Sequence, residues 1–220
     1  IQVPSCWRNL HLNVLPKKDK SNKQIAEYIN KNCQGQRGIV YCAKGQDTVD
    51  LAHELKTSNV NAVFVHGALT DFERKMNVHA WTSGLAQVIC ATNSFGMGID
   101  QKDVRFVLHK TFPKSLDDYF QETGCVGRDG QPSLCTLLFR HTDRSFHLNN
   151  IFKIQDVDHQ KHKYGLLNDI VNFCDNSCSC RHQLIEVYFN EDAHLECKEN
   201  CDICDGQNMK EKNPKLFCLN

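Results

Sequence analysis

The sequence predicts an α/β fold with a doubly wound, largely parallel sheet, followed by a small helical subdomain. Up to about residue 139, short apolar runs alternate with stretches of helical periodicity, as in Gly38–Cys42 followed by residues 46–57. Strands that alternate with helices of about 10 to 15 residues form right-handed βαβ crossovers, with helices on both faces of a parallel sheet. Beyond residue 139 the strand-like runs stop, which indicates a change to a helical region.

Each element of the first region is predicted by a local pattern. Residues 9–14 alternate polar and apolar side chains, which is typical of a half-buried edge strand. Further strands are expected at 38–42, 62–65, 87–91, 105–109 and 134–139, and helices at 21–33, 46–57, 71–81 and 115–122. Thr70 is a suitable N-cap for the third helix. The predicted core consists of Ile39, Val40, Val63, Val65, Val88, Ile89, Val107, Leu108, Leu137 and Leu138.

The second region is predicted to be helical. Helices are expected at 143–153, 160–174 and 180–189, and the middle one carries an apolar stripe of Leu166, Leu167, Ile170, Val171 and Phe173. We therefore expect three parts, residues 1–145, 146–206 and 207–220, of which the last is a polar, loose terminus.

Composition narrows the class of protein. Hydrophobic residues make up 40% and charged residues 24% of the 220, as in a soluble globular protein. No apolar run approaches the roughly 20 residues that span a bilayer, and no signal peptide opens the chain.

Residues 1–150 hold 18 Lys and Arg against 14 Asp and Glu, whereas residues 151–220 hold 8 against 12, so charge alone does not predict nucleic-acid binding. Because the chain begins at Ile1, we expect a fragment of a longer protein.

Four of the thirteen cysteines have the spacing of a structural zinc site. The set is Cys180, Cys197, Cys201 and Cys204. Four thiolates complete the tetrahedral shell of structural zinc, and metal binding then contributes folding free energy to a small module. Two alternatives stay open: scattered buried thiols without a metal, and Cys178 or Cys174 as the fourth ligand. A secreted disulfide framework is disfavoured by the long regular elements.

The stretch Gln121–Gly130 has a composition suited to a ligand-binding turn. Three glycines occur within seven residues, and glycine permits tight turns and close approach of the backbone to a ligand. The guanidinium of Arg128 offers a planar fork of donors to a phosphate. The alternative is a plain polar turn after the helix around Tyr119.

In order and spacing, several segments resemble motifs IV, V and VI of superfamily 2 helicases, and in detail those of the RecQ family. They are Ile39–Cys42, Val65–Leu69, Val88–Thr92, Phe95–Asp100, Val104–His109 and Gln121–Gly130. The family's motif V reads AT-x-x-FGMGID and its motif VI reads QE-x-GRAGRDG. The resemblance covers nearly all of residues 1 to 205. It also selects Cys180 as the first zinc ligand, because that cysteine precedes an arginine-led helix, here Arg181–Leu184.

The resemblance implies a second RecA-like helicase lobe followed by a helical zinc-binding subdomain. Arg128 takes the place of the arginine finger, and Gln121 stands where the family couples nucleotide state to lobe closure. Asp100, Gly98 and Gly127 take nucleotide-facing places, although Asp100 is also a plausible helix or turn cap. ATP and Mg²⁺ are implied cofactors. Because no G-x-x-x-x-G-K-[ST] sequence occurs, we expect this polypeptide alone not to hydrolyse ATP.

DNA is the implied partner, together with further domains of the parent chain and without a membrane. Contacts to phosphates are expected from Lys44, His66 and Thr92, each of which follows a predicted strand. Each has an alternative interpretation: a solvated lysine, a hydrogen-bonded loop histidine and a turn cap. The family implies 3′-to-5′ unwinding in replication, recombination and repair, and a nuclear location, or a cytoplasmic one for a bacterial source.

One departure from the family pattern bears on activity. The first arginine of motif VI is Cys125 here, and a neutral thiol does not replace a fixed positive charge. Three outcomes stay open: a tolerated variant, an inactivating change, or sufficiency of Arg128. A catalytically silent module that binds DNA or a protein partner is therefore the alternative to a helicase, and a zinc-stabilised scaffold without nucleic-acid contact is a third possibility.

Overall fold

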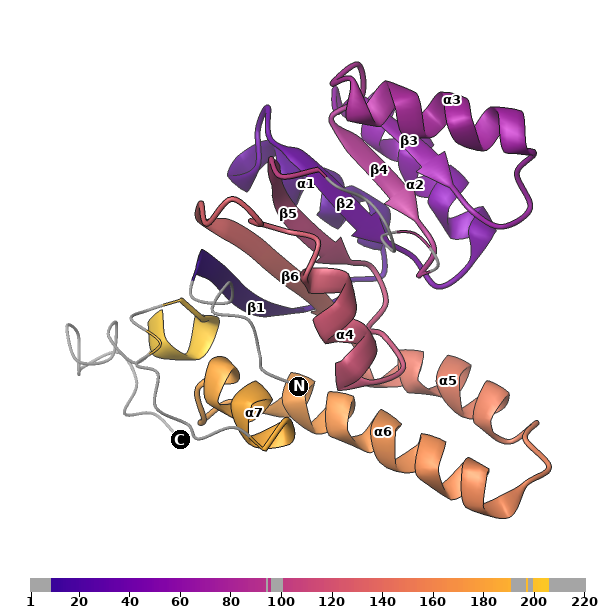
Figure 1. The fold of residues 1–220 in the computed structure, drawn as a ribbon, viewed down its shortest axis with the longest axis vertical. Coiled ribbons are helices and arrows are strands. Elements are labelled where there is room, and N and C mark those ends of the chain that lie inside the picture. Colours follow the sequence, from indigo (N-terminus) through magenta and orange to yellow (C-terminus); the bar gives the residue numbers. More distant parts are fainter. Residues whose placement is uncertain (1–8, 94, 96–100, 191–196, 198–199, 206–220) are drawn as a thin grey trace.

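The computed structural model describes residues 9–93, 95, 101–190, 197 and 200–205. Six strands and seven α-helices are assigned within these residues (Figure 1). The strands are β1 (Leu10–Pro16), β2 (Arg37–Tyr41), β3 (Ala62–Val65), β4 (Val88–Ala91), β5 (Val104–His109) and β6 (Ser133–Phe139). The helices are α1 (Ser21–Asn32), α2 (Gly45–Thr57), α3 (Asp71–Thr82), α4 (Leu116–Thr123), α5 (Arg144–Ile151), α6 (Val157–Asp175) and α7 (Arg181–Tyr188).

The six strands form one parallel sheet in the order β1-β6-β5-β2-β4-β3. Strand β2 lies near the middle, and the chain crosses over through α2, α3 and α4 to reach the strands on either side. All strands therefore end at the same edge, which collects the loops after β2, β3, β4 and β5. The predicted α/β class with a parallel sheet is confirmed, and β1 is an edge strand as expected.

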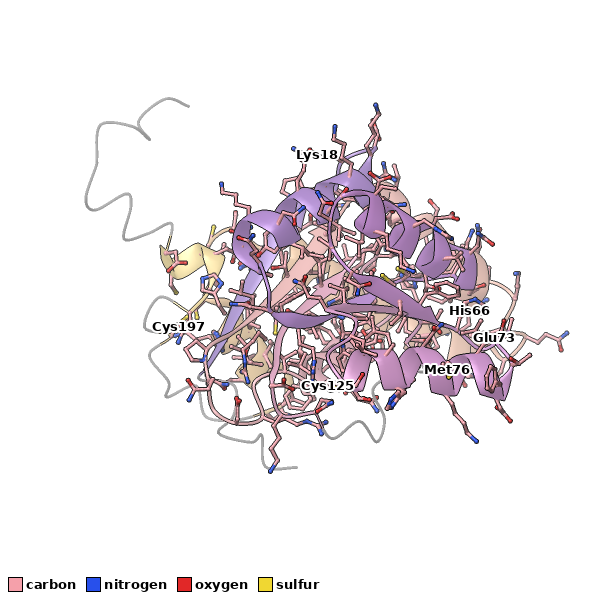
Figure 2. All side chains as sticks on the ribbon, turned by 90° about the horizontal axis from the view of Figure 1, so that it is seen from above. Lys18, His66, Glu73, Met76, Cys125 and Cys197 are labelled. Atoms are coloured by element: carbon pink, nitrogen blue, oxygen red, sulfur yellow. The ribbon has the colours of Figure 1, made fainter. Side chains whose placement is uncertain are left out.

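Two apolar layers cover the two faces of the sheet. Side chains of α1 and α2, such as Ile29 and Leu55, pack with Val40 and Val88 on one face. Side chains of α3, α4, α6 and α7, including Trp81 and Tyr119, form the layer on the other face. Figure 2 shows α3 across the sheet from α1 and α2. Every residue of the predicted core is buried except Val63, which is half-buried on the edge strand β3.

The helical part follows β6 and lies beside α4 (Figure 1). Helix α6 begins at Val157, three residues before the predicted start, because the Asp156 side chain accepts a hydrogen bond from the His159 N–H and caps the helix there. The Lys17 ammonium bonds to Asp143, which ties the end of β1 to the turn before α5. Among the described residues, no helix has the length and apolar character needed to cross a bilayer.

Candidate functional site: the motif VI loop, the carboxyl edge and a cysteine cluster

The loop after α4 is shaped by two glycines with left-handed backbone. Gly127 has φ +60° and Gly130 has φ +79°, values that glycine adopts without steric cost. A side chain at Gly127 would place its Cβ 2.4 Å from Asn9 Nδ2, an approach that requires a shift of the surrounding atoms. The Gly127 N–H donates to the Val104 carbonyl at 3.1 Å, and its carbonyl accepts from Asn9 Nδ2 at 2.8 Å. The left-handed φ and the packing against Asn9 and Ser133 therefore account for glycine at position 127.

Arg128 and Gln121 both lie on the surface. The Arg128 Nε donates to the Gly124 carbonyl at 3.1 Å, and its Nη2 lies 3.9 Å from the Cys125 sulfur. The guanidinium thus turns back over the end of α4, and the orientation of α4 determines where this charge points. Among the described residues, the loop carries its cationic group at a solvent-facing position, where a phosphate can reach it.

Cys125 differs from Arg128 because its side chain is buried, with 5% of its surface exposed. Burial raises the pKa of the Cys125 thiol, and the nearby Arg128 charge opposes that rise. The thiol is therefore neutral at physiological pH. Figure 2 places Cys125 on the side of the sheet that also carries Met76 of α3. The side chain at this position is part of the packed layer under the loop.

A buried polar pair fixes α4 to the sheet. Glu122 Oε2 and His109 Nε2 lie 2.8 Å apart, with 7% and 0% of their surfaces exposed. The His109 ring stacks on Tyr41 with ring centroids 5.3 Å apart. The hydrogen-bonded pair joins the last turn of α4 to the carboxyl end of β5, and the stacking on Tyr41 extends this link to the end of β2. Sequence reasoning did not single out either residue, although an acid after Gln121 and a histidine ending an apolar strand were visible signals.

The opposite side of α4 contacts the helical part. The Tyr119 and Phe173 rings lie 5.5 Å apart, and Phe120 and Phe189 lie 4.7 Å apart. The Tyr188 hydroxyl donates to Asp117 Oδ2 at 2.7 Å. Burial, followed by the bond to Asp117, raises the pKa of Tyr188, so its hydroxyl keeps the proton that it donates. Helix α4 is therefore held between the sheet and helices α6 and α7.

The three candidate DNA contacts lie at one edge of the sheet. Lys44 follows β2, His66 follows β3 and Thr92 follows β4, and these strands are neighbours in the order β2-β4-β3. Lys44 is exposed, and its Nζ lies 5.5 Å from the centre of the Phe146 ring. His66 Nδ1 accepts from the Ala68 N–H at 3.3 Å, so this histidine has a local bond as well as a place at the edge.

A cavity of about 240 Å³ lies at the same edge, between α4 and α5. Its walls include Tyr41, His109, Asp118, Glu122, Phe146 and His147. His147 Nε2 donates to the Phe112 carbonyl at 2.9 Å, and burial lowers the pKa of His147, so its ring is neutral. The cavity therefore lies between α4, the helix in which the motif VI stretch begins, and the Phe146 ring that Lys44 contacts.

The four cysteines of the predicted zinc set meet at one point. The sulfur atoms of Cys180, Cys197, Cys201 and Cys204 all lie within 4.8 Å of one another. Zn–S bonds of about 2.3 Å put tetrahedral sulfurs about 3.8 Å apart, so the set fits a zinc ion. Cys178 is exposed and Cys174 is buried, and neither belongs to the cluster.

Hydrogen bonds among the clustered cysteines shift the pKa values of their thiols in opposite directions. A hydrogen bond from the Cys180 thiol lowers the pKa of Cys201 to about 4, and the same bond raises that of Cys180. Burial raises the pKa of Cys197 to about 12. Without a metal, one thiolate is thus favoured beside thiols that keep their protons. A divalent metal would replace those protons, because cysteine binds a metal as the thiolate.

Contacts around the cluster attach it to the sheet edge. Arg181 binds Asp202 through Nε to Oδ1 at 2.5 Å and Nη2 to Oδ2 at 2.9 Å. Asp202 Oδ2 also accepts from the Val14 N–H at 3.0 Å, and the Leu12 N–H donates to the Asn200 carbonyl at 3.0 Å. The backbone of 200–202 therefore covers the outer edge of β1, which otherwise offers unpaired groups to other chains.

Two family models match the chain. The model for the helicase conserved C-terminal domain matches residues 20–130, just over half of the chain, and the model for RecQ zinc-binding matches residues 142–205. The chain belongs to the RecQ family of helicases. It corresponds to a C-terminal region of these superfamily 2 proteins.

Curated RecQ relatives match most of this chain. ATP-dependent DNA helicase hus2/rqh1 of Schizosaccharomyces pombe is 34% identical over 199 residues, covering 89% of this chain and 15% of that protein. RecQ-like DNA helicase BLM of Xenopus laevis is 36% identical, covering 90% of this chain and 15% of that protein. The putative ATP-dependent DNA helicase Q1 of Caenorhabditis elegans is 36% identical, with 91% and 31% coverage. The chain thus spans a third or less of these relatives.

Solved structures support the lobe's architecture. The E. coli DEAD-box protein SrmB, bound to regulator of ribonuclease activity A, superposes with a TM-score of 0.54 and 22% identity, covering 67% of this chain and 86% of that one. A DEAD box protein from Methanococcus jannaschii gives 0.56 and 19%, covering 74% of this chain and 41% of that one. At these identities the likeness shows the fold, which is RecA-like.

The sequence-predicted site residues that the structure describes fall into three groups. The four cysteines are brought together, and Lys44, His66 and Thr92 share one edge. Arg128, Gln121 and Gly127 belong to one helix-and-loop unit. Gly98 and Asp100 lie outside the described residues. The RecQ pattern of the loop is therefore present except at positions 125 and 126, and at position 125 a buried neutral thiol stands in place of the family's first arginine.

Proposed function

We propose that this chain is the C-terminal motor half of a RecQ-type ATP-dependent DNA helicase. We assign residues 1–145 to its second RecA-like lobe and residues 146–206 to its zinc-binding subdomain, whereas the remaining segment, 207–220, lies outside the described residues. The observation that carries the proposal is the exposed Arg128 guanidinium, held at the end of α4 on a lobe that matches the helicase C-terminal domain. The whole motor needs a further lobe with a phosphate-binding loop, so the 220 residues alone are inactive.

In this proposal Arg128 acts as the arginine finger. Its donors meet the charge that develops on the γ-phosphate when ATP, held with Mg²⁺ by the other lobe, is cleaved. Gln121, one helical turn before the loop, senses whether the two lobes have closed around the nucleotide. The family resemblance assigns Gly98 and Asp100 to nucleotide binding. The left-handed backbone of Gly127 permits the turn that carries Arg128.

DNA binding is assigned to the carboxyl edge of the sheet. Lys44, His66 and Thr92 contact backbone phosphates, because they follow adjacent strands and present a charge, a ring nitrogen and a hydroxyl at one edge. Such contacts carry no base information, so we expect binding to depend on salt and on DNA structure rather than on sequence.

Zinc is assigned to Cys180, Cys197, Cys201 and Cys204 with a structural role. Four thiolates leave no open position for substrate, and the bound ion supplies folding free energy to the helical part. The names of the relatives, which are DNA helicases, support work on DNA. A nuclear location and a role in replication, recombination and repair are our extension from the family resemblance.

The test is strand separation by the natural-length protein. We expect ATP-dependent separation of a duplex with a 3′ single-stranded tail, and none with a 5′ tail. Arg128→Ala should abolish separation while leaving salt-dependent binding to forked DNA. Separation of only the 5′-tailed duplex would reverse the assigned direction.

The second candidate function is a catalytically silent module that binds DNA or a protein partner. The buried, neutral Cys125 favours it, because the family's first motif VI arginine is missing. Salt-dependent DNA binding without any ATP-dependent separation of either duplex would support this candidate over the helicase.

A further inference from the structure

Helix α7 connects the cysteine cluster directly to the helix that carries motif VI. Its N-cap is Cys180, one of the four clustered cysteines, and its last residue is Tyr188. Two turns of helix therefore separate a proposed zinc ligand from a residue that touches α4.

The C-terminal end of α7 contacts α4 through one hydrogen bond and one contact between aromatic rings. The Tyr188 hydroxyl donates to Asp117 Oδ2 at 2.7 Å, in the first turn of α4. The next residue, Phe189, packs its ring on Phe120 with centroids 4.7 Å apart and planes inclined by 56°. One contact fixes the start of α4 and the other fixes its middle, so both its position and its rotation are held.

The end of α4 in turn determines the direction of Arg128. Gly124 is the C-cap residue of this helix, and its carbonyl accepts from Arg128 Nε at 3.1 Å. The Val126 N–H donates to the Thr123 carbonyl at 3.1 Å, so the start of the loop is bonded to the last turn of the helix. A tilt of α4 therefore moves the guanidinium.

We propose that Tyr188, the last residue of α7, and Phe189, its C-cap, position α4 and with it Arg128 for ATP hydrolysis, so that the cysteine cluster influences turnover through a single helix. This inference rests on the proposed helicase function. Tyr188 is a positioning residue: it contacts neither nucleotide nor DNA in this arrangement, and it acts through α4.

The effect should appear in turnover rather than in binding. A displacement of about 1 Å at a reacting group costs up to about 100-fold in rate, and the loss of one positioning bond should cost less, about 10-fold. Because Lys44, His66 and Thr92 follow strands β2, β3 and β4, whereas Tyr188 acts on α4, DNA affinity should be unchanged.

The experiment uses the natural-length protein with Tyr188→Phe, which removes the hydroxyl and keeps the ring. The matched control is Tyr164→Phe on α6, which also removes one hydroxyl contact, the 3.1 Å bond from Arg144, on the same helical part. We expect about a 10-fold lower kcat for Tyr188→Phe with unchanged KM and zinc content, and no change for Tyr164→Phe. Hydrogen exchange of residues 116–130 should be faster only in Tyr188→Phe.

Two results would overturn the inference. One is a wild-type kcat together with wild-type exchange in Tyr188→Phe. The other is an equal loss in both variants, which would indicate general destabilisation. Failure of the helicase proposal looks different, because the wild-type protein then has no DNA-stimulated hydrolysis. In that case the exchange of residues 124–130 still decides whether Tyr188 holds the loop.

Discussion

The motif VI loop and the cysteine cluster are both polar turns at helix ends, yet the protein holds them in opposite ways. The cluster is closed: four sulfurs face one another, and Asp202 joins it to both Arg181 and β1. The loop is closed only at its base, where Gly127 packs against Asn9, while Arg128 and Gln121 face outward. In the proposed function this difference has a simple meaning. The cluster holds its metal with ligands from this chain alone, whereas the loop acts on a nucleotide held by another part of the protein.

The largest expected effect comes from opening the cluster. Cys201→Ser removes a buried ligand that also lies against Leu12 of β1. We expect loss of one zinc ion per chain and unfolding of the helical part, because structural zinc contributes on the order of 10 kcal/mol in small modules. Zinc release and a thermal melt measure it.

Cys178→Ser is the matched control for this prediction. Cys178 is exposed and outside the cluster, so this variant should keep its zinc and its melting temperature. Equal zinc loss in both variants would mean that Cys178 is a ligand and that the assignment of Cys180 needs revision.

The second-largest expected effect concerns Arg128 in the motif VI loop. Arg128→Ala in the natural-length protein should lower the kcat of DNA-stimulated ATP hydrolysis about 10³-fold, equivalent to about 4 kcal/mol of transition-state stabilisation. The melting temperature should be unchanged, because the side chain is exposed. Arg128→Lys keeps the charge without the fork and should recover part of the rate. A turnover that is insensitive to both changes would remove Arg128 from the mechanism.

A smaller effect tests the base of the loop. Gly127→Ala forces a side chain at φ +60° into Asn9 and Ser133, and we expect it to lower the free energy of unfolding by about 1–3 kcal/mol. Gly130→Ala has a similar φ of +79° with no atom within 4 Å of its Cβ, so its cost should be smaller. Urea denaturation of the two variants compares them. An equal cost would show that backbone strain, rather than packing against β1, requires glycine at 127.

The smallest effect concerns the carboxyl edge. Lys44→Ala should weaken DNA binding severalfold and reduce the slope of log affinity against log salt by about 1, as expected for one lost phosphate contact. Lys56→Ala, in the last turn of helix α2, whose N-cap residue is Lys44, is the control and should leave the slope unchanged. Fluorescence anisotropy over a salt series measures both. Equal slopes for Lys44→Ala and the wild type would place the DNA elsewhere.

Local patterns predicted most of the fold, because alternation and helical periodicity report which side chains face the core. The spacing of Cys201 and Cys204 predicted a metal site, since ligands that close one knuckle are near in sequence. The Glu122–His109 pair, the covering of β1 by residues 200–202 and the Tyr188–Asp117 bond were not predicted. These contacts join residues that only the tertiary fold brings together, and a single sequence carries no signal of their pairing.

Position 125 provides the most direct test of the account. The measurement is DNA-stimulated ATP hydrolysis by the natural-length protein beside its Cys125→Arg variant. If Arg128 alone supplies the finger, the natural protein hydrolyses ATP, and the added arginine, at a position only 5% exposed, changes the rate little. Hydrolysis by the arginine variant alone would contradict the account, and would show that Cys125 has silenced the motor.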